Sequence, residues 1–365
     1  MPAFRILFKT LIVSAICLYS QVKLQAQVYG CTDAAAQNYN AAATINNGSC
    51  TYKKASVNTV LNSNITTALN ETSGLLWWNQ FVWTHNDSGG QPAIYSLNSS
   101  TGAIVKTVSI TNATNVDWED MTQDNTYIYI GDFGNNSNGN RTDLKIYRIK
   151  KADVKSQTSV TAAVINYSYS DQTDFTPKGS NNTNFDCESI IAYGDSLFLF
   201  SKNWVDNKTR LYKLPKTPGT HTAVKIGELN VEGLITGAEI VAAKRVIVLT
   251  GYNPSLVPFV YMLYDFQGNN FFGANKRKVD INQTVFQMEG ICSFNARKFY
   301  ISNERVQKVV TVPAKLQTIN LGPLLNPYYN TISLQKNEEH VTVVDMPNTE
   351  KHKGFDPKNV RVEEY

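Results

Sequence analysis

The chain has 365 residues, 42% of them hydrophobic, and its 34 basic and 30 acidic residues leave a net charge of +4. This length and apolar content allow one large domain or two ordinary ones and exclude a fully disordered chain. The near balance of charge offers no electrostatic case for a nucleic-acid partner. We therefore expect a folded protein that does not bind nucleic acid.

Residues 1–26 have the pattern of a signal peptide. Arg5 and Lys9 supply the positive start, the segment LIVSAICLYS supplies the apolar run, and Ala26 is a small residue at the expected cleavage point. This run is too short to span a bilayer, and nothing later approaches 18 uninterrupted apolar residues. The sequence predicts an exported protein without a transmembrane segment, located outside the cell, on its surface or in the periplasm.

Residues 27–53 are predicted to form a small module of their own. The segment is rich in Asn and Ala, lacks a hydrophobic core and contains Cys31 and Cys50. A segment this small needs a covalent staple to hold one conformation, so we expect a Cys31–Cys50 disulfide. Residues 30–33 (GCTD), 38–40 (NYN) and 48–50 (GSC) resemble a short module of secreted Bacteroidetes proteins. Alanine and Ile-Asn-Asn replace that module's usual prolines and acids, which favours a structural clip over a calcium-binding loop.

Short strands that begin with an acid recur along residues 54–320. Each is followed by a second apolar run that ends in polar groups, and then by an alternating third run. Helical signals are almost absent, and a repeated unit of this kind near 50 residues long is typical of a β-propeller. The sequence therefore predicts an all-β propeller of five blades. The five repeated acids are Glu71, Glu119, Glu188, Glu239 and Glu289.

Three points of this organisation stay open. A degenerate sixth blade would combine the segment ASVNTVLNSN with material after residue 315. The long interval between Glu119 and Glu188 favours a single blade with an elongated outer strand or loop. Residues 321–365 fit no repeat, and no role is assigned to them. Cys187 and Cys292 adjoin equivalent inner strands, where they either form a bridge or remain free buried thiols.

The repeated acids would lie together. The innermost strand of each propeller blade runs along a central channel, so equivalent residues form a ring, and five converging carboxylates repel one another. A hard divalent cation would neutralise them, and Ca²⁺ suits a flexible cage of carboxylates and amides. Asp132 would complete this metal site. The alternative is that each glutamate accepts hydrogen bonds from neighbouring strands and staples the blades together.

Other side chains fall near the same channel mouth. The loop GDFGNNSNGNRTD has alternating oxygens that can circle a cation, and Arg141 can pair with Asp132 or Glu119. Trp118 and Trp204 flank the mouth, where they either stack on a sugar or pack in the core. No GxSxG, HExxH or P-loop motif is present, so no catalytic residue is assigned. The predicted ligand-binding residues are Asp87, Asp117, Trp118, Asn136, Arg141 and Trp204.

The first two units resemble a group of secreted bacterial propellers. ETSGLLWWNQFVWTHND and NVDWEDM, followed by YIYIGDFGNN and LKIYRI, are similar to the SdiA-regulated and esterase-like phytase propellers. The resemblance covers about residues 60–310. More distantly, EGI and YISN in the last unit are similar to the gluconolactonase and regucalcin propellers. That resemblance implies a channel calcium ion that activates a lactone or ester, although Glu stands in every unit here.

Three functional interpretations follow. The first is a binding or scaffold propeller stabilised by Ca²⁺ through its channel carboxylates. The second is a metal-dependent hydrolase that acts on an ester, lactone or phosphoester, with a spare carboxylate as base. The third is a module that recognises a glycan or a cell-surface partner through the aromatic side chains at the mouth.

Overall fold

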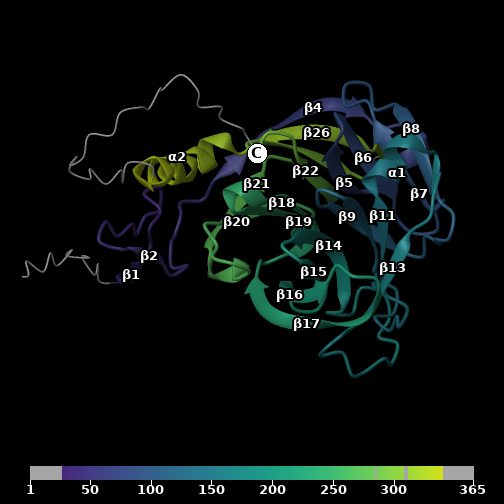
Figure 1. Cartoon of the computed structure of the whole chain (residues 1–365), viewed down its shortest axis with the longest axis horizontal. Coiled ribbons are helices and arrows are strands. Elements are labelled where there is room, and N and C mark those ends of the chain that lie inside the picture. Colours follow the sequence, from purple (N-terminus) through teal and green to yellow (C-terminus); the bar gives the residue numbers. More distant parts are fainter. Residues whose placement is uncertain (1–26, 284–285, 308–310, 340–365) are drawn as a thin grey trace, which may run out of the picture.

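The computed structural model describes residues 27–283, 286–307 and 311–339, and the predicted signal peptide lies outside these ranges. Four-stranded antiparallel sheets are arranged around a central axis, as a propeller requires (Figure 1). Blade one consists of β5 (Thr72–Trp78), β6 (Phe81–Asn86), β7 (Ala93–Leu97) and β8 (Ile104–Ile110). Blade two consists of β9 (Trp118–Gln123), β10 (Tyr127–Asp132), β11 (Lys145–Lys150) and β13 (Ala163–Tyr169). Blade three consists of β14 (Asp186–Tyr193), β15 (Ser196–Lys202), β16 (Lys208–Pro215) and β17 (Gly219–Asn230).

The last two blades consist of β18 (Leu234–Val241), β19 (Val246–Tyr252), β20 (Pro258–Tyr264) and β21 (Asn275–Ile281); and β22 (Met288–Ser293), β23 (Lys298–Asn303), β26 (Lys315–Asn320) and β4 (Thr59–Asn64). The inner strands contact one another in the cyclic order β5, β9, β14, β18, β22 and back to β5. This closed ring fixes the number of blades at five.

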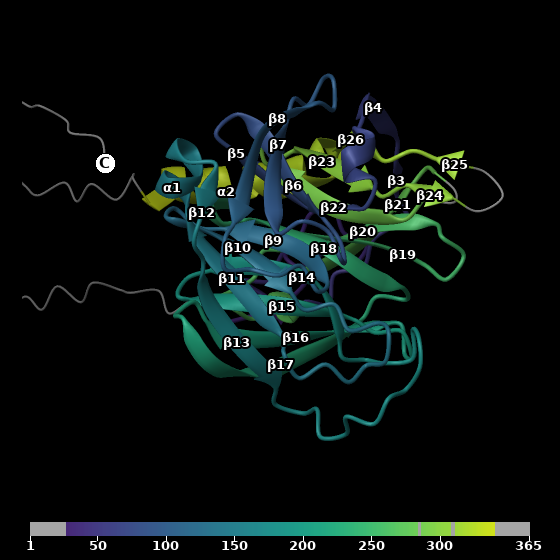
Figure 2. The same cartoon turned by 90° about the vertical axis from the view of Figure 1, so that its right-hand side faces the viewer.

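The segment that suggested a sixth blade belongs to the fifth. Strand β4 pairs antiparallel with β26, with Val60 opposite Thr318 and Asn64 opposite Lys315. The association of this segment with residues after 315 is therefore confirmed, while the sixth blade is wrong. One strand from before the first blade supplies the outer strand of the last, so chain segments from both ends complete one sheet (Figure 2).

The outer edges of the other blades are paired across blade boundaries. β12 (Ser159–Val160) joins β8, β3 (Ser56–Val57) joins β21, and β13 pairs in parallel with β17. The last pairing merges blades two and three into one eight-stranded sheet. The long interval between Glu119 and Glu188 is one blade, as expected, with α1 (Lys151–Ser156) and β12 inserted before its outer strand.

Apolar side chains that alternate along the strands fill the spaces between blades. Trp77, for example, packs against Phe294 and Tyr300, which joins blade one to blade five. The remaining short elements are η1 (Thr67–Leu69), η2 (Ala242–Lys244), η3 (Phe271–Gly273), β24 (Val306–Gln307) and β25 (Thr311–Val312).

A helix that the sequence did not predict follows the last blade. α2 (Gly322–Glu339) buries Leu325, Tyr328 and Tyr329 in the core cluster of blades four and five. The Tyr328 hydroxyl donates to the carbonyl of Lys244 at 3.0 Å, and the Tyr329 hydroxyl donates to that of Ala296 at 2.7 Å. The start of the segment without an assigned role thus covers one end of these blades. Among the described helices, none is long and apolar enough to cross a membrane.

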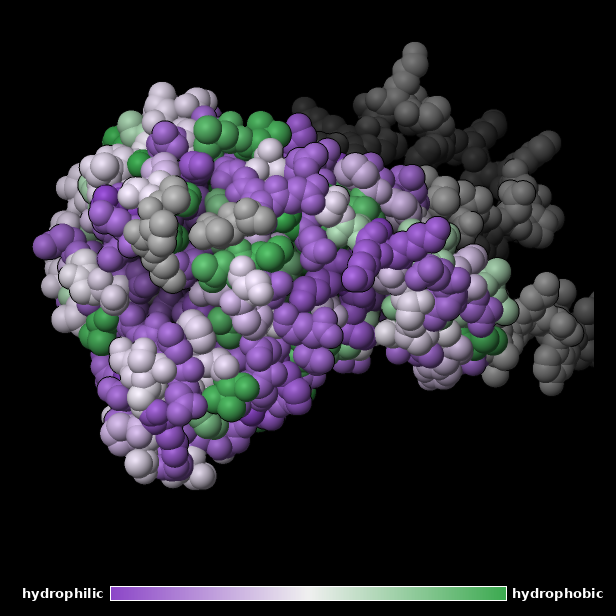
Figure 3. All heavy atoms as spheres, turned by 180° about the vertical axis from the view of Figure 1, so that it is seen from behind, coloured by the Kyte–Doolittle hydropathy of each residue, from purple (hydrophilic) through white to green (hydrophobic). Residues whose placement is uncertain are grey.

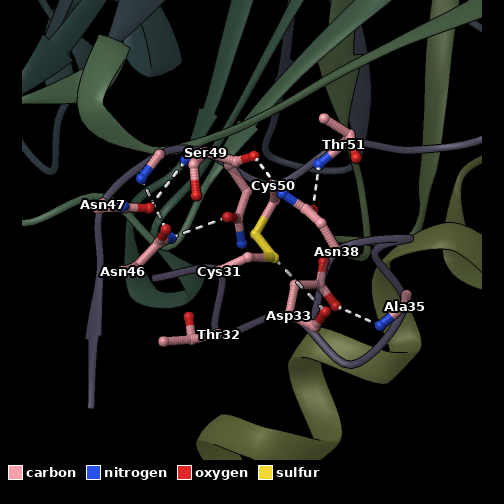
Figure 4. Close-up of a disulfide and its surroundings, with 12 residues drawn as sticks. Cys31, Thr32, Asp33, Ala35, Asn38, Asn46, Asn47, Ser49, Cys50 and Thr51 are labelled. Atoms are coloured by element: carbon pink, nitrogen blue, oxygen red, sulfur yellow. Dashed lines mark hydrogen bonds between the residues drawn. A yellow bond between two sulfur atoms is a disulfide. The ribbon is translucent and has the colours of Figure 1, made fainter. Parts of the chain in front are cut away.

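The disulfide Cys31–Cys50 is present and closes the N-terminal module, which contains β1 (Tyr29–Gly30) and β2 (Ile45–Asn46). Asn38 ties the module internally, since its side chain accepts from Thr51 N and donates to the Ser49 carbonyl (Figure 4). Cys187 and Cys292 are both buried free thiols. The bridge that was left open for them does not form.

Polar contacts dock this module on blade four. The Tyr264 hydroxyl donates to Asp33 Oδ2 at 2.6 Å, and Asn46 Nδ2 donates to Asn275 Oδ1 at 2.8 Å. Lys276 Nζ donates to the Gly48 carbonyl at 2.9 Å.

The face of the molecule drawn in Figure 3 is largely hydrophilic, with its apolar residues in separate patches.

One buried carboxylate links three inner strands. Asp120 of β9 accepts from Met121 N on its own strand at 2.8 Å, from Ile190 N on β14 at 3.0 Å and from Ala238 N on β18 at 3.2 Å. Burial raises the pKa of this carboxyl, and the three N–H donors oppose that shift. Asp120 thus joins neighbouring blades by accepting hydrogen bonds from their inner strands, which is the alternative role expected for its neighbour Glu119.

We expect Asp120→Asn to destabilise the fold by about 3 kcal/mol, because its amide group would point N–H donors at backbone N–H donors. Differential scanning calorimetry should show a fall of about 4–6 °C in Tm. The matched control is Asp174→Asn, an exposed acid paired with Lys178, which should shift Tm by less than about 2 °C. Equal effects of the two changes would contradict the role given to Asp120.

Candidate functional site at the channel mouth

Each inner strand is irregular at the same place near one mouth of the channel. The pairing with the second strand of the blade shifts there, as between Trp118 and Met121 on β9 or Met288 and Gly290 on β22. A bulge re-aims the side chains that it carries. The residues at this position, called here the ring position, are Ser73, Glu119, Glu188, Thr236 and Glu289.

Three of the five predicted glutamates therefore occupy the ring and two do not. Glu71 comes one residue before β5, is exposed, and lines a pocket of about 410 Å³ with Asn86 and Arg305. Glu239 lies three residues beyond the ring position of β18, where burial raises the pKa of its carboxyl to about 8. The predicted register is wrong at these two acids, because Ser73 and Thr236 fill their places.

The hydroxyls at the ring position serve a structural purpose. Ser73 Oγ donates to the carbonyl of Glu119, and Thr236 Oγ1 donates to the carbonyl of Met288. Each bond joins one inner strand to the next. Carboxylates therefore occupy the ring position in blades two, three and five, and hydroxyls occupy it in blades one and four.

Two groups of carboxylates share Glu119. Group one contains Asp87, Asp117 and Glu119, and group two contains Glu119, Asp186 and Glu188. Within each group, one oxygen from every residue lies within 4.8 Å of the others. Gly134 makes this approach possible, since a Cβ added there would collide with Glu119 Oε1 and Asp117 Oδ2. Any side chain at position 134 would therefore separate the acids.

Group two is supplied with hydrogen-bond donors by the protein itself. Lys202 Nζ lies 2.6 Å from both carboxylate oxygens of Glu188. Asp186 accepts from Asn135 N at 2.7 Å and from Trp204 Nε1 at 2.7 Å. This half of the mouth thus contains its own cation.

Group one has no ion pair with a basic side chain in the part of the chain that the structure describes. Glu119 is 3% exposed, and its Oε1 has no hydrogen-bond partner. Burial and four neighbouring carboxyls raise the pKa of Glu119 well above its ordinary value. Burial likewise raises the pKa of Asp87 to about 8 and that of Asp117 to about 6. Three acids converge here without a positive charge between them.

Asp132 and Arg141 form an ion pair, one of the two partners expected for the arginine. Arg141 donates to Asp132 Oδ1 at 2.9 Å and to the Gly134 carbonyl at 2.7 Å, which holds the loop after β10 over the acids. Asp132 also accepts from Asp117 N at 3.2 Å, while its Oδ2 has no partner. It does not belong to either carboxylate group. The structure therefore gives Asp132 a role in holding Arg141 and the backbone of Asp117 rather than a place in either group.

Two other predicted ligand-binding residues lie elsewhere. Trp118 is fully buried and donates to the Thr114 carbonyl at 2.9 Å, so it cannot stack on a ligand. Asn136 holds the outer loop through a backbone bond from Asn181 N, and its neighbour Asn135 is the residue that contacts Asp186. Trp204 is half-buried and donates from its indole N–H to Asp186, and its role in ligand binding stays a prediction.

Three charged residues of the site were not predicted from the sequence: Asp186, Lys202 and Glu304. Asp186 stands two residues before Glu188, as Asp117 stands two residues before Glu119, and this repeated D-x-E pattern was a usable signal. Burial raises the pKa of Glu304, which also faces Lys202. No sequence pattern distinguished Lys202 from the other 33 basic residues.

A scan of the sequence against protein-family models finds no match, and neither does a search of the curated proteins. Among solved structures, the chain is similar to a glucose dehydrogenase, with 6% identity, 70% of this chain and 98% of that chain covered, and a TM-score of 0.40. It is also similar to an α-L-arabinofuranosidase from Podospora anserina in complex with cellotriose, with 7% identity, coverages of 73% and 96%, and a TM-score of 0.40. It is similar as well to an exo-β-1,3-galactanase from Phanerochaete chrysosporium with galactose. The identity is 10%, the match covers 71% of this chain and 64% of that chain, and the TM-score is 0.44. The propeller assignment stands on the strand topology of this chain.

A buried histidine beside the site makes stability depend on pH. His85 is fully buried on β6, edge-on to Trp118, and burial lowers its pKa to about 4. Between pH 4 and 6.5 the unfolded chain binds a proton at this residue that the folded chain does not. This group therefore costs the folded state about 3 kcal/mol as the pH falls from 6.5 to 4.

We expect His85→Gln to remove that component. Urea unfolding of wild type and variant at pH 7, 6 and 5 should show the wild type losing stability relative to the variant as the pH falls. The difference between the two proteins isolates His85 from the carboxyls, which titrate in both. His221→Gln, at a half-buried site on β17, is the matched control. If the stability of His85→Gln changes with pH in the same way as that of the wild type, this explanation is excluded.

Proposed function

We propose that the protein is an exported, Ca²⁺-binding β-propeller that binds an oxygen-rich ligand at its channel mouth. The observation that carries the proposal is the buried Glu119 carboxylate, whose unpartnered Oε1 converges with Asp87 and Asp117. Leaving three such acids ionised without a cation is energetically costly. A bound cation offsets that cost, and it fits the oxygen-only donor set.

The size of the group suits one calcium ion. Ca²⁺ binds oxygens at about 2.3–2.6 Å, so ligands on opposite sides of one ion lie up to about 5 Å apart. The oxygens of Asp87, Asp117 and Glu119 lie within 4.8 Å of one another. Because Ca²⁺ takes about 6–8 ligands, three carboxylates leave positions for water or a ligand. Asp87 and Asp117 are half-buried, which leaves the site an open side.

A carbohydrate or a similar polyhydroxy ligand fits this arrangement best. Sugar hydroxyls are oxygen ligands that Ca²⁺ accepts, and a half-buried tryptophan offers a flat apolar face to a sugar ring. Trp204 is held beside group two by its bond to Asp186. Export, and kinship with SdiA-regulated or esterase-like phytase propellers, remain predictions from the sequence that agree with this role.

A metal-dependent hydrolase is the second candidate, favoured by the pair Asp87 and Asp117. A carboxyl that is not needed to hold the cation can act as general base. In this scheme Asp87 and Glu119 hold the cation, and Asp117 is the spare carboxylate that accepts a proton from water. A bound cation would polarise the ester, lactone or phosphoester oxygen.

We expect Ca²⁺ to raise the Tm of the mature wild-type protein, after dialysis against EDTA, by about 4 °C at a concentration of about 100 Kd. Glu119→Gln should abolish most of this shift, because it removes the one carboxylate common to both groups. Glu71→Gln is the control, since this exposed acid lies outside the groups. Calorimetric thermal scans with and without Ca²⁺ measure all three proteins.

The proposal fails if millimolar Ca²⁺ leaves the wild-type Tm unchanged. A shift that survives in Glu119→Gln would place the ion elsewhere in the molecule. Glycan-array binding in Ca²⁺ and in EDTA then tests the ligand class, with the same two variants as probes.

For the hydrolase candidate, we expect Asp117→Asn to lower kcat by about 10²–10⁴-fold on any ester, lactone or phosphoester that the wild type cleaves. Isothermal titration with Ca²⁺ on the same variant shows whether metal affinity changed as well. If the wild type turns over none of a panel of chromogenic esters, lactones and phosphoesters, the hydrolase candidate is excluded for these substrates and ligand binding is the function.

A further inference from the structure

Lys202 is the basic side chain at the centre of the acids. It ends β15, is 4% exposed, and contacts both oxygens of Glu188 at 2.6 Å. Its Nζ lies 4.7 Å from the centre of the Trp204 ring and 5.4 Å from that of Tyr252. These contacts on several sides leave the ammonium group little freedom to move.

Lys202 lies among the acids of group two. Glu188 is its ion-pair partner, and Trp204, whose ring centre lies 4.7 Å from Lys202 Nζ, donates to Asp186. Arg141, the other basic group at this mouth, is committed to Asp132 and Asp143. Lys202 is therefore the cationic side chain that contacts group two.

Group two, which contains the ion-pair partner of Lys202, is arranged like the carboxylates of the proposed calcium site. One oxygen each from Glu119, Asp186 and Glu188 lies within 4.8 Å of the others, the same limit that group one meets. All three residues are at most 3% exposed. Two cations could thus sit on either side of the shared Glu119, which is the arrangement of bridged two-metal sites, about 3.5–4 Å apart.

We propose that Lys202 occupies the place of a second divalent cation and so limits the channel mouth to one bound ion. The inference rests on the proposed calcium site of group one and extends it to stoichiometry. The lysine supplies one fixed positive charge where a metal would supply two exchangeable ones. Glu188 consequently pairs with Lys202 and does not bind a metal ion or a ligand. The carboxylates of group one stay accessible from their open side.

The test is the metal content of Lys202→Ala, which removes the charge and opens space for an ion. The full mature chain is equilibrated with Ca²⁺, and bound ions are counted by isothermal titration and by elemental analysis after gel filtration. We expect one ion in the wild type and two in Lys202→Ala. Lys202→Arg keeps the charge and should bind one. Lys208→Ala, which removes a half-exposed lysine paired with Glu228 on the same blade, should also bind one.

Stability provides the second readout, because Lys202→Ala leaves buried carboxylates unpaired and unfolds more easily. Ca²⁺ should raise its Tm by more than it raises that of the wild type, and a variant that folds only in Ca²⁺ would support the proposal. One bound ion in Lys202→Ala, or no rescue of its folding by Ca²⁺, would overturn it. A wild type without bound Ca²⁺ would instead overturn the proposed function, so the two failures are distinguishable.

Discussion

The pairing of β4 with β26 is the constraint on which the rest of the molecule depends. No blade can bury both of its faces alone, so each relies on its neighbours, and the ring of neighbours must close. Here the closure joins residues 59–64 to residues 315–320 in one sheet. The carboxylates at the mouth come from different blades and converge only when that ring is complete. The geometry of the site is therefore a property of the whole chain.

Much of the fold followed from local patterns in the sequence. Alternating strands in repeated units indicated a propeller, and the isolated cysteines 31 and 50 indicated a disulfide. Helix α2 escaped prediction because its burial rests on Leu325, Tyr328 and Tyr329, which read equally well as a strand or loop. Its stability comes from packing against blades four and five, and such long-range contacts leave little trace in a local sequence.

The site was harder to predict because it depends on register. Glu71 and Glu239 look equivalent to Glu119 in the sequence, yet the bulge of each inner strand gives their places to Ser73 and Thr236. A shift of one or two residues moves a side chain to another face or another depth. Asp120 shows the same sensitivity, since it lies one residue from Glu119 and is fully satisfied by backbone N–H groups. The missing information was three-dimensional: which strands bulge, and where Lys202 arrives from β15.

The parallel pairing of β13 with β17 also has a mechanical meaning. Backbone hydrogen bonds between these strands join blades two and three edge to edge, in addition to the side-chain packing that all neighbours share. These two blades should move as one body. The boundary between blades one and two has a shorter pairing of the same kind, because β12 of blade two joins β8 of blade one. Group two, including Lys202, belongs entirely to this pair, whereas group one draws Asp87 from blade one. Two residue pairs join the strand edges of blades one and two, against five between blades two and three, so a small rotation at the first of these boundaries would widen or narrow the mouth more easily.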